Sequence, residues 1–466
     1  MICTDAEKID SGNIISELQK AMAIHVKNSG EIKYLWDYCR GKQPILYRVK
    51  KVRPEICNKI VENRANEIVS FKVGYLCGEP IQYISRSVDE TTSKGISFLN
   101  EMMFSENKAS KDKEVIEWQM ISGTSYRLVL PDEDFIDDGV PFNIFTLDPR
   151  YTFVVYSNEI GNKPMFGATY YQDESGINHF SVYSKDNFWK IVGSNIIENK
   201  PHALDDIPIF EYPANNARLG SFEIVLPLLD EINNISSNRM DGIEQFVQSF
   251  VKFINCDIDE TKFSELKALG AIKVKSIDGN NADVDIVSSE LSQSDTQITK
   301  EDCYNSILTI CGMPNRNGGT STSDTGAAVL LRDGWSLAEA RAKDSELMFK
   351  KSEQKMLKLV LRICRDTKGV PSEINALGVK DIALQFTRRN YENVQSKSQV
   401  LVSMLQQEKI HPRLAFTSCG LFSDPEQAYA ESMENYNAEK RVQDEIDTTE
   451  QTNRQGSLKS QAGENL

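Results

Sequence analysis

Residues 221–254 read SFEIVLPLLDEINNISSNRMDGIEQFVQSFVKFI, and this stretch decides how the chain is organised. Its apolar side chains recur at helical intervals, at Leu228, Leu229, Ile232, Ile235, Ile243, Phe246, Val247, Phe250 and Val251. That spacing predicts one amphipathic helix over the whole stretch, with Pro227 in its first turns. A helix this long and this apolar usually buries a face against neighbours, which predicts a partner for it.

Two further helices are predicted downstream. One spans residues 294–311, and the other spans residues 327–366, a length of roughly 60 Å at about 1.5 Å per residue. Gly334 is a candidate bend in the longer helix. This helix carries nine basic residues against six acidic ones. Its charges either form a solvated face laced with ion pairs or contact a polyanion or an acidic neighbouring subunit.

Two shorter segments separate the three helices. Residues 257–293 predict a small unit, with a helix at 262–269 and a hairpin that pairs residues 272–277 with residues 284–287. Residues 315–325 read NRNGGTSTSDT and contain almost nothing apolar. Such a segment cannot bury enough apolar area to hold itself folded.

The first 220 residues predict an α+β region. Residues 11–41 predict two helices that end at Gly41, and a long helix is predicted from Pro54 to just before Gly78. One more helix is predicted around residues 111–121. Alternating aromatic and β-branched residues predict strands at 81–84, 125–130, 151–156, 166–171 and 180–183.

The C-terminal part predicts helices again. Residues 391–407 have a helical apolar pattern, and Ser423-Asp424-Pro425-Glu426 is a capping box with proline at the first helical position. Beyond residue 440 aromatic residues are absent and aliphatic residues are few. We expect that tail to be solvated and mostly disordered.

Composition narrows the class of protein. The chain has 466 residues, of which 40% are hydrophobic and 26% are charged, as expected for a soluble protein of several domains. Its net charge of −15 lacks the excess of Lys and Arg that tight DNA binding requires. Nine scattered cysteines without a C-x-x-C pair favour free thiols in a cytosolic protein. No apolar run is long enough to span a bilayer.

No motif in the sequence predicts catalysis or a cofactor. There is no G-x-x-x-x-G-K-[ST] phosphate loop, no H-E-x-x-H and no G-x-S-x-G. The four histidines have no Cys or His partner at metal-ligand spacing. An acidic cluster at Asp132, Glu133, Asp134, Asp137 and Asp138 could suggest paired catalytic carboxylates, but a solvated loop explains it more simply.

One oxygen-rich stretch invites comparison with a calcium site. Asp278, Asn280, Asp283 and Asp285 lie beside a glycine, yet the stretch lacks the sixth-position glycine and the final glutamate of an EF-hand loop. Asn, Asp and Gly dominate hairpin turns, so we interpret the stretch as a turn and expect no metal.

Six short strings occur in a fixed order over residues 34–240. They are Tyr38-Cys39-Arg40-Gly41 with Ile45; Asn63 with VGYLCGEPIQY at 73–83; Gly123-Thr124-Ser125-Tyr126; Asp148-Pro149-Arg150-Tyr151 with FVVY at 153–156; Ile207-Pro208-Ile209 with Asn215-Asn216; and Ser221-Phe222-Glu223 with Leu229, Asp230, Asn233 and Ser236. In these strings and their order the chain resembles the portal proteins of long-tailed bacteriophages. The tyrosine common before the position of Asn233 in that family is missing, and residues 257–293 match by position only.

The resemblance implies an α+β portal fold with an α+β wing, a helical stem, a small α/β clip, a long bent helix and a helical crown. The implied parts are a wing at 1–220, stem helices at 221–256 and 294–313, a clip at 257–293, a tunnel loop at 314–326, a long wing helix at 327–368, a crown at 369–440 and a disordered tail at 441–466.

The resemblance also implies a function and a set of partners. Twelve copies would form a ring at the capsid vertex, through which double-stranded DNA is packaged and ejected. Implied partners are the capsid and scaffolding proteins, the terminase large subunit during packaging and a head–tail connector protein afterwards, with no membrane and no cofactor. The protein would lie in the virion, at the portal vertex, and in the host cytoplasm during assembly.

Two sets of site residues follow from the resemblance. The tunnel loop would face DNA through Asn315, Arg316, Asn317, Gly318, Gly319, Thr320, Ser321, Thr322, Ser323, Asp324 and Thr325, although a surface linker would have the same composition. The clip would dock the motor and then the connector through Asp278, Asn280, Asp283 and Asp285, and its excess of acidic residues suggests a basic partner.

A DNA-binding module of a mobile element without ring assembly is the alternative function. It would need basic and aromatic residues interleaved on one face. Here the aromatic residues lie mainly in the strand-rich half, away from the basic helix at 327–366.

Overall fold

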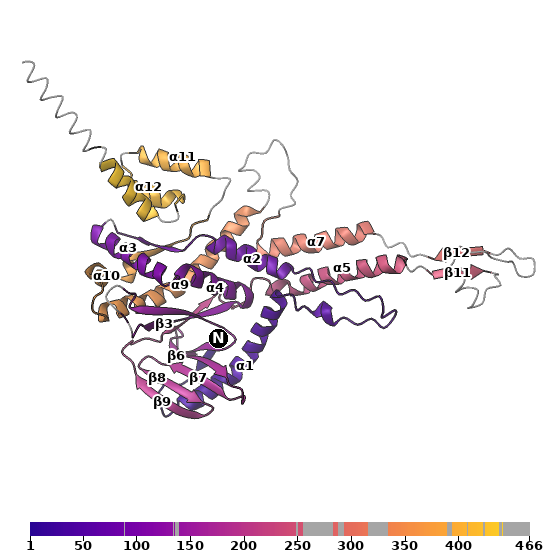
Figure 1. Cartoon of the computed structure of the whole chain (residues 1–466), viewed down its shortest axis with the longest axis horizontal. Coiled ribbons are helices and arrows are strands. Elements are labelled where there is room, and N and C mark those ends of the chain that lie inside the picture. The colour runs from indigo at the N-terminus through magenta and orange to yellow at the C-terminus, as the bar shows by residue number, and fades with distance from the viewer. Residues whose placement is uncertain are drawn as a thin grey trace, which may run out of the picture.

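The computed structural model describes residues 1–87, 89–133, 135, 139–247, 250–254, 283–287, 293–315, 334–388, 394–407, 409–422, 425–437 and 440. The chain is divided into an α/β body, a two-helix arm that projects from it, and a group of C-terminal helices on the opposite side of the body (Figure 1). The α+β fold class expected from the sequence is confirmed.

A six-stranded sheet forms one end of the body, in the order β1-β5-β6-β7-β8-β9. Its strands are β1 (Ile2–Thr4), β5 (Thr152–Ser157), β6 (Pro164–Gln172), β7 (Asn178–Tyr183), β8 (Asn187–Val192) and β9 (Asn195–Pro201). β1 runs parallel to β5, and the other pairs are antiparallel. One face packs on helix α1 (Ile14–Cys39) through a core that contains Leu18, Phe166 and Trp189. The N-terminal segment is therefore tied into the sheet at both β1 and α1.

A second sheet, in the order β10-β3-β4, forms the centre of the body. It comprises β3 (Thr124–Pro131), β4 (Phe142–Leu147) and β10 (Ile209–Pro213). Around it lie α2 (Arg64–Cys77), α3 (Glu90–Ser105), α4 (Lys108–Ser122), α9 (Trp335–Asp366) and α10 (Ser372–Ala376). Gly123 joins α4 to β3 with a φ of +74°, and a Cβ atom there would lie 2.2 Å from the carbonyl oxygen of Arg218. Only glycine fits this turn.

Two strands distant in sequence also pair within the body. β2 (Gln82–Ser85) and β13 (Ile382–Gln385) are antiparallel, with Tyr83 opposite Leu384. The short 3₁₀ helices are η1 (Pro44–Tyr47), η2 (Glu223–Val225) and η3 (Val379–Asp381). The C-terminal group comprises α11 (Val394–Leu405), α12 (Pro412–Cys419) and a helical segment at residues 425–437.

Four charged side chains form a fully buried cluster between α4, β3 and α9. Arg127 donates to Asp112 at 2.7 Å and to Glu353 at 3.1 Å, and the Lys108 ammonium lies 3.0 Å from Glu353 and also pairs with Asp112. None of the four side chains is more than 4% exposed. Two positive and two negative charges balance, which makes their burial tolerable.

Two tyrosine hydroxyls supply further hydrogen bonds to the buried Glu353 carboxylate. The hydroxyls of Tyr83 and Tyr212 each donate to the Glu353 carboxylate at 2.6 Å. Burial alone would raise the pKa of Glu353, but the charges of Lys108 and Arg127 and the two tyrosine hydrogen bonds hold it below its ordinary value. Glu353 therefore links α9 to α4, β2, β3 and β10 as a carboxylate.

The arm is made of α5 (Leu226–Val247) and α7 (Gln293–Cys311), with the strand pair β11 (Phe250–Ile254) and β12 (Asp283–Val287) beyond them (Figure 1). The prediction of one helix over 221–254 is wrong, because the helix ends at Val247 and residues 250–254 form a strand. A short apolar run rich in Phe, Val and Ile fits either structure, and pairing with β12 selects the strand.

Other boundary predictions also need correction. The strand predicted at 284–287 is confirmed, but its described partner is β11, whereas residues 262–269 and 272–277 lie outside the described residues. Residues 14–39 form one helix rather than two, since Gly30 is tolerated within it. Gly334 adopts a φ of +81° as the N-cap of α9, so it marks the start of the described helix.

Replacing Glu353 with glutamine should destabilise the protein by about 3–5 kcal/mol, because Arg127 and Lys108 would keep their charges in a dry interior without a full counter-charge. Chemical denaturation at a fixed protein concentration measures the change. The exposed Asp344 on the same helix provides the matched control, since Asp344→Asn should change stability by less than about 0.5 kcal/mol. Equal effects of the two substitutions would contradict the role given to the buried cluster.

Candidate functional site

An extended segment at residues 58–62 lies along one side of the arm helix α5. Its alternate backbone N–H groups donate to side chains of α5, from Asn58 to Asp241 at 2.7 Å, from Ile60 to Ser237 at 3.0 Å and from Glu62 to Asn233 at 2.8 Å. Two extended residues advance about 6.6 Å, and one four-residue helical step advances about 6 Å, so the two repeats match. This interaction is why the helix predicted from Pro54 begins only at Arg64.

Polar side chains hold both ends of this contact. At one end Asp241 also accepts from Lys50 at 3.1 Å and pairs with Arg48 at 3.3 Å. Burial alone would raise the pKa of Asp241, but the hydrogen bonds from Asn58 and Lys50 lower it below its ordinary value. Asn233 donates to Gln43 at the other end at 2.5 Å. The segment and α5 thus form one unit.

The second arm helix, α7, is fixed to α2 and to α5. The hydroxyl of Tyr304 donates to Glu67 at 2.9 Å, Lys300 pairs with Glu62, and Arg239 donates to Gln297 at 2.8 Å. These contacts hold the arm against the end of the body.

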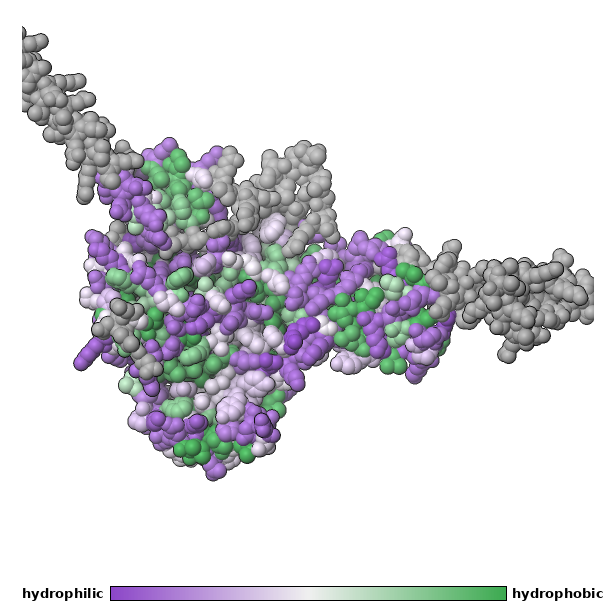
Figure 2. Space-filling view, viewed as in Figure 1, coloured by the Kyte–Doolittle hydropathy of each residue, from purple (hydrophilic) through white to green (hydrophobic). Residues whose placement is uncertain are grey.

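Apolar side chains remain on the outside of the arm. Met240, Ile243 and Ile298 are exposed, and the last of these has 57% of its surface accessible. Figure 2 shows these helices with apolar patches between hydrophilic side chains. Such a surface on a projecting element is typical of a protein–protein contact.

The predicted tunnel residues lie almost wholly outside the described part of the chain. Asn315 is described, and its side-chain amide donates to Asn305 at 3.2 Å, whereas Arg316, Asn317, Gly318, Gly319, Thr320, Ser321, Thr322, Ser323, Asp324 and Thr325 are among the residues outside it. The described part of the chain breaks off at Asn315 and resumes at Gly334, which lies next to Pro314. A Cβ atom on Gly334 would lie 3.7 Å from Met313 O and from Pro314 Cα. Residues 315 to 334 therefore begin and end at one place, where α7 meets α9.

Of the predicted clip residues, Asp283 and Asp285 lie on β12 at the far end of the arm (Figure 1). In the antiparallel register they lie opposite Ile254 and Lys252. Asp278 and Asn280 lie outside the described residues. The structure thus places two of the four predicted residues on the same short strand.

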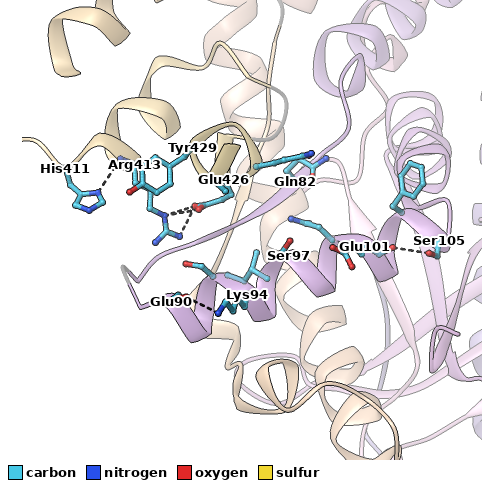
Figure 3. Close-up of a pocket in the computed structure, with 16 residues that line it drawn as sticks. Gln82, Glu90, Lys94, Ser97, Glu101, Ser105, His411, Arg413, Glu426 and Tyr429 are labelled. Carbon is cyan, nitrogen blue, oxygen red and sulfur yellow. Dashed lines mark hydrogen bonds and ion pairs between the residues drawn. The ribbon is translucent and has the colours of Figure 1, made fainter. Parts of the chain in front are cut away.

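A groove with a volume of about 1000 Å³ lies between α3 and the C-terminal helices (Figure 3). Arg413 forms a bidentate pair with Glu426 on one wall, and Lys94 pairs with Glu90 at 2.9 Å on the other. Phe104 also lines the groove and is 83% exposed. These four charges are paired within each wall, and this arrangement does not resemble a nucleophile with its base.

The four histidines have structural partners. His25 is buried, donates from Nε2 to the carbonyl oxygen of Arg150 at 3.1 Å, and has its pKa lowered to about 4 by burial. His179 pairs with Asp173, His202 contacts the carbonyl oxygen of Ser184, and His411 caps α12. Within the described ranges no group of three or more His, Cys, Asp or Glu side chains could hold a metal ion.

Some of the charges on α9 form ion pairs along the helix, which is one of the two interpretations offered for its basic residues. Lys343 pairs with Glu339 and Lys350 pairs with Glu346, each one helical turn apart. In the acidic cluster at residues 132–138, Asp132 accepts from Asn143, while Asp134, Asp137 and Asp138 lie outside the described residues.

None of the described helices is long and apolar enough to cross a membrane.

Sequence reasoning missed the two polar features that organise this structure. Lys108 and Asp112 recur on α4 at the same helical interval as the buried Val115, Ile116 and Gln119. Charged residues in register with an apolar face were therefore a usable signal for the buried cluster. The contact of residues 58–62 with α5 had no such signal, because its donors are backbone groups.

Comparison with known proteins gives one family. The family model described as "Phage portal protein, SPP1 Gp6-like" matches residues 19–446. No curated protein matches the chain. A solved structure described as "Neck of empty GTA particle computed with C6 symmetry" is 13% identical, with a TM-score of 0.45 over 77% of this chain and 90% of that chain. Another, "Virion of native gene transfer agent (GTA) particle", is 13% identical, with a TM-score of 0.42 over 77% and 89%.

Substituting Ser237 with alanine should leave the Ile60 N–H without its acceptor, at a cost of about 1–3 kcal/mol. Hydrogen–deuterium exchange at the Ile60 amide should then speed up together with that of its neighbours in residues 58–62. Ser306→Ala, at an exposed position on α7, is the control and should leave that exchange unchanged. Unaltered protection of Ile60 in the Ser237 variant would show that this contact does not hold the segment.

Proposed function

The chain belongs to the SPP1 Gp6-like family of phage portal proteins, a structural family without enzymatic activity, and on that premise we propose that its copies form the ring through which double-stranded DNA enters and leaves a phage capsid. The family match over residues 19–446 carries this proposal. The protein would act at the portal vertex of the virion, after assembly in the host cytoplasm with capsid and scaffolding proteins.

The arm supports a ring rather than a monomer. Its two helices project from the body and expose Met240, Ile243 and Ile298, although a lone chain gains nothing from apolar side chains in water. Contacts between unlike surfaces of successive copies can cover them and close on themselves. We propose twelve copies.

The packing of the described elements supports an assignment of each part of the portal fold. We propose that the body forms the wing, α5 and α7 the stem, and the β11–β12 end of the arm the clip. Because β13 pairs with β2 in the body, we place the start of the crown at α11, later than residue 369. The wing then includes residues 1–220 and α9, with the tail at 441–466 outside it.

Assembly provides the first test. Light scattering of the purified protein at micromolar concentration and moderate salt should give a mass of many subunits, and negative-stain images should show rings with a central hole. A DNA-binding module without ring assembly, the alternative function, would give compact particles without a hole. A mass equal to one subunit of 52.6 kDa would contradict the proposal.

The loop between α7 and α9 is proposed to line the narrowest part of the channel. Its two ends meet at Pro314 and Gly334, so it extends from one fixed point of each subunit. Its small hydroxyl and amide side chains offer DNA weak contacts, whereas a ring of lysines would hold phosphates tightly. Only Arg316 and Asp324 are charged between residues 315 and 325.

A bulky maleimide on Ser321→Cys should stall DNA packaging while ring assembly stays intact, because the label would narrow the channel at every copy. The background lacks reactive native cysteines, and unlabelled rings of the same variant are the control. Packaging at the unlabelled rate would place the loop away from the constriction.

The end of the arm is proposed to dock the terminase large subunit and then the head–tail connector. Asp283 and Asp285 lie on β12, in the part of the described arm that is farthest from the body (Figure 1). Replacing both with lysine should leave rings intact but abolish packaging or tail joining, since a basic partner would be repelled. Phage yield from a complementation assay measures the effect, and a normal yield would refute this docking role.

A further inference from the structure

The segment that follows α1 is strongly basic within an acidic protein. Seven basic residues and one acidic residue lie between positions 40 and 59, although the whole chain has a net charge of −15. Several of these cations pair within the subunit: Arg48 and Lys50 with Asp241, Lys42 with Asp37, and Arg53 with Glu55. Lys51 and Lys59 are exposed on the same segment. The surface around this segment is therefore positive.

The same segment also exposes apolar side chains to an unusual degree. Tyr47, Val49 and Val52 have 77%, 83% and 76% of their surfaces accessible. They lie between the basic residues in the sequence, and the segment that carries them runs beside α5, on its side opposite α7 (Figure 1). We call residues 46–53 the basic loop. Its mixture of apolar and basic side chains is typical of a surface that a protein partner covers.

The outer face of α7 has the complementary chemistry. Asp295, Ile298 and Asp302 follow one another at helical intervals, so they lie on one stripe of the helix, and all three are exposed. Glu301 is exposed nearby, whereas Lys300 is turned toward Glu62. An apolar side chain between acidic ones here matches apolar side chains between basic ones on the basic loop.

We propose that the basic loop of one subunit docks on the outer face of α7 of a second copy of this chain. The inference rests on the proposed ring and names the surfaces that build it. One subunit carries both surfaces on opposite sides of α5, and such a head-to-tail contact repeats from copy to copy until the ring closes. Opposite charges then fix the register, and burial of Val49, Val52 and Ile298 supplies the affinity.

Duplex DNA fits the basic loop less well than a second copy does. A phosphate backbone attracts cations, but it offers nothing to cover three side chains that are each more than three-quarters exposed.

Cross-linking tests the contact directly. Val49→Cys and Ile298→Cys are combined in the full-length chain with Cys57→Ser and Cys303→Ser, and assembled rings are treated with a flexible bismaleimide. The double variant should give a ladder of multiples of the subunit mass in denaturing gels. Mixed rings of the two single variants should stop at dimers, because each subunit then offers one reactive surface. Rings of either single variant alone should give only monomers.

Charge reversal provides an independent readout. Lys51→Glu and Asp302→Lys should each weaken self-association about tenfold, and the combined variant should recover to within about threefold of the original. Lys33→Glu, at an exposed position on α1, is the control and should leave the rings unchanged.

The outcomes separate this contact from the proposed function. Rings that form normally in every variant, without a ladder, would overturn the contact and leave the portal ring standing. An original chain that never forms rings would overturn the portal ring itself. Loss of duplex DNA binding in Lys51→Glu rings that remain intact would identify the basic loop as a DNA surface and overturn the contact.

Discussion

The ion pairs between Arg127 and its two carboxylate partners, Asp112 and Glu353, are the interaction on which the rest of the body depends. Arg127 has no exposed surface, and Glu353 lies 226 positions away in the sequence. A buried cation without its partners would cost several kcal/mol. The cluster is therefore stable only when α4, β3 and α9 are all in place, which makes these three elements depend on one another.

This dependence also explains how the body carries a long excursion of the chain. The chain leaves the central sheet after β10, builds the arm, and returns as α9. Tyr212 on β10 and Glu353 on α9 meet in the buried cluster, where the tyrosine hydroxyl donates at 2.6 Å. The two ends of the excursion are thus fastened to each other, and the base of the arm packs into the same core through Leu229 and Ile307.

Sequence patterns predicted several strands and helices, including β2, whose partner β13 is distant in the sequence, but they missed α3 and the local hairpin of β8 and β9. The strands around Tyr126, Phe153 and Phe180 followed from alternation of apolar residues, and the helix at 294–311 from its spacing. The start of α2 could not be predicted, because the backbone of residues 58–62 is satisfied by side chains of α5 nearly 180 positions later. Phe250 could not be assigned to a strand without knowledge of β12.

The candidate site residues were also only partly predictable from the sequence. Asp285 falls in the strand predicted at 284–287, whereas Asp283 was interpreted as part of a turn and lies on β12. The meeting of Pro314 with Gly334, where the end of α7 reaches the start of α9, had no signal in the local pattern. Charged residues on an apolar helix face, such as Asp112, were present in the pattern. Reading them as a buried cluster requires the partner Arg127, which lies on another element.

The distribution of charge gives the proposed channel a physical rationale. A conduit for DNA must avoid a surface that binds phosphates, and an acidic chain of net charge −15 satisfies this condition on average. Basic residues are nevertheless needed wherever acidic subunits touch, because like charges at a contact oppose assembly. Grouping cations around the basic loop, with Asp241 and Glu55 beside them, would serve the proposed contacts between copies while limiting the positive field elsewhere. The proposed ring would thus separate the positive charge that assembles it from the surface along which DNA would slide.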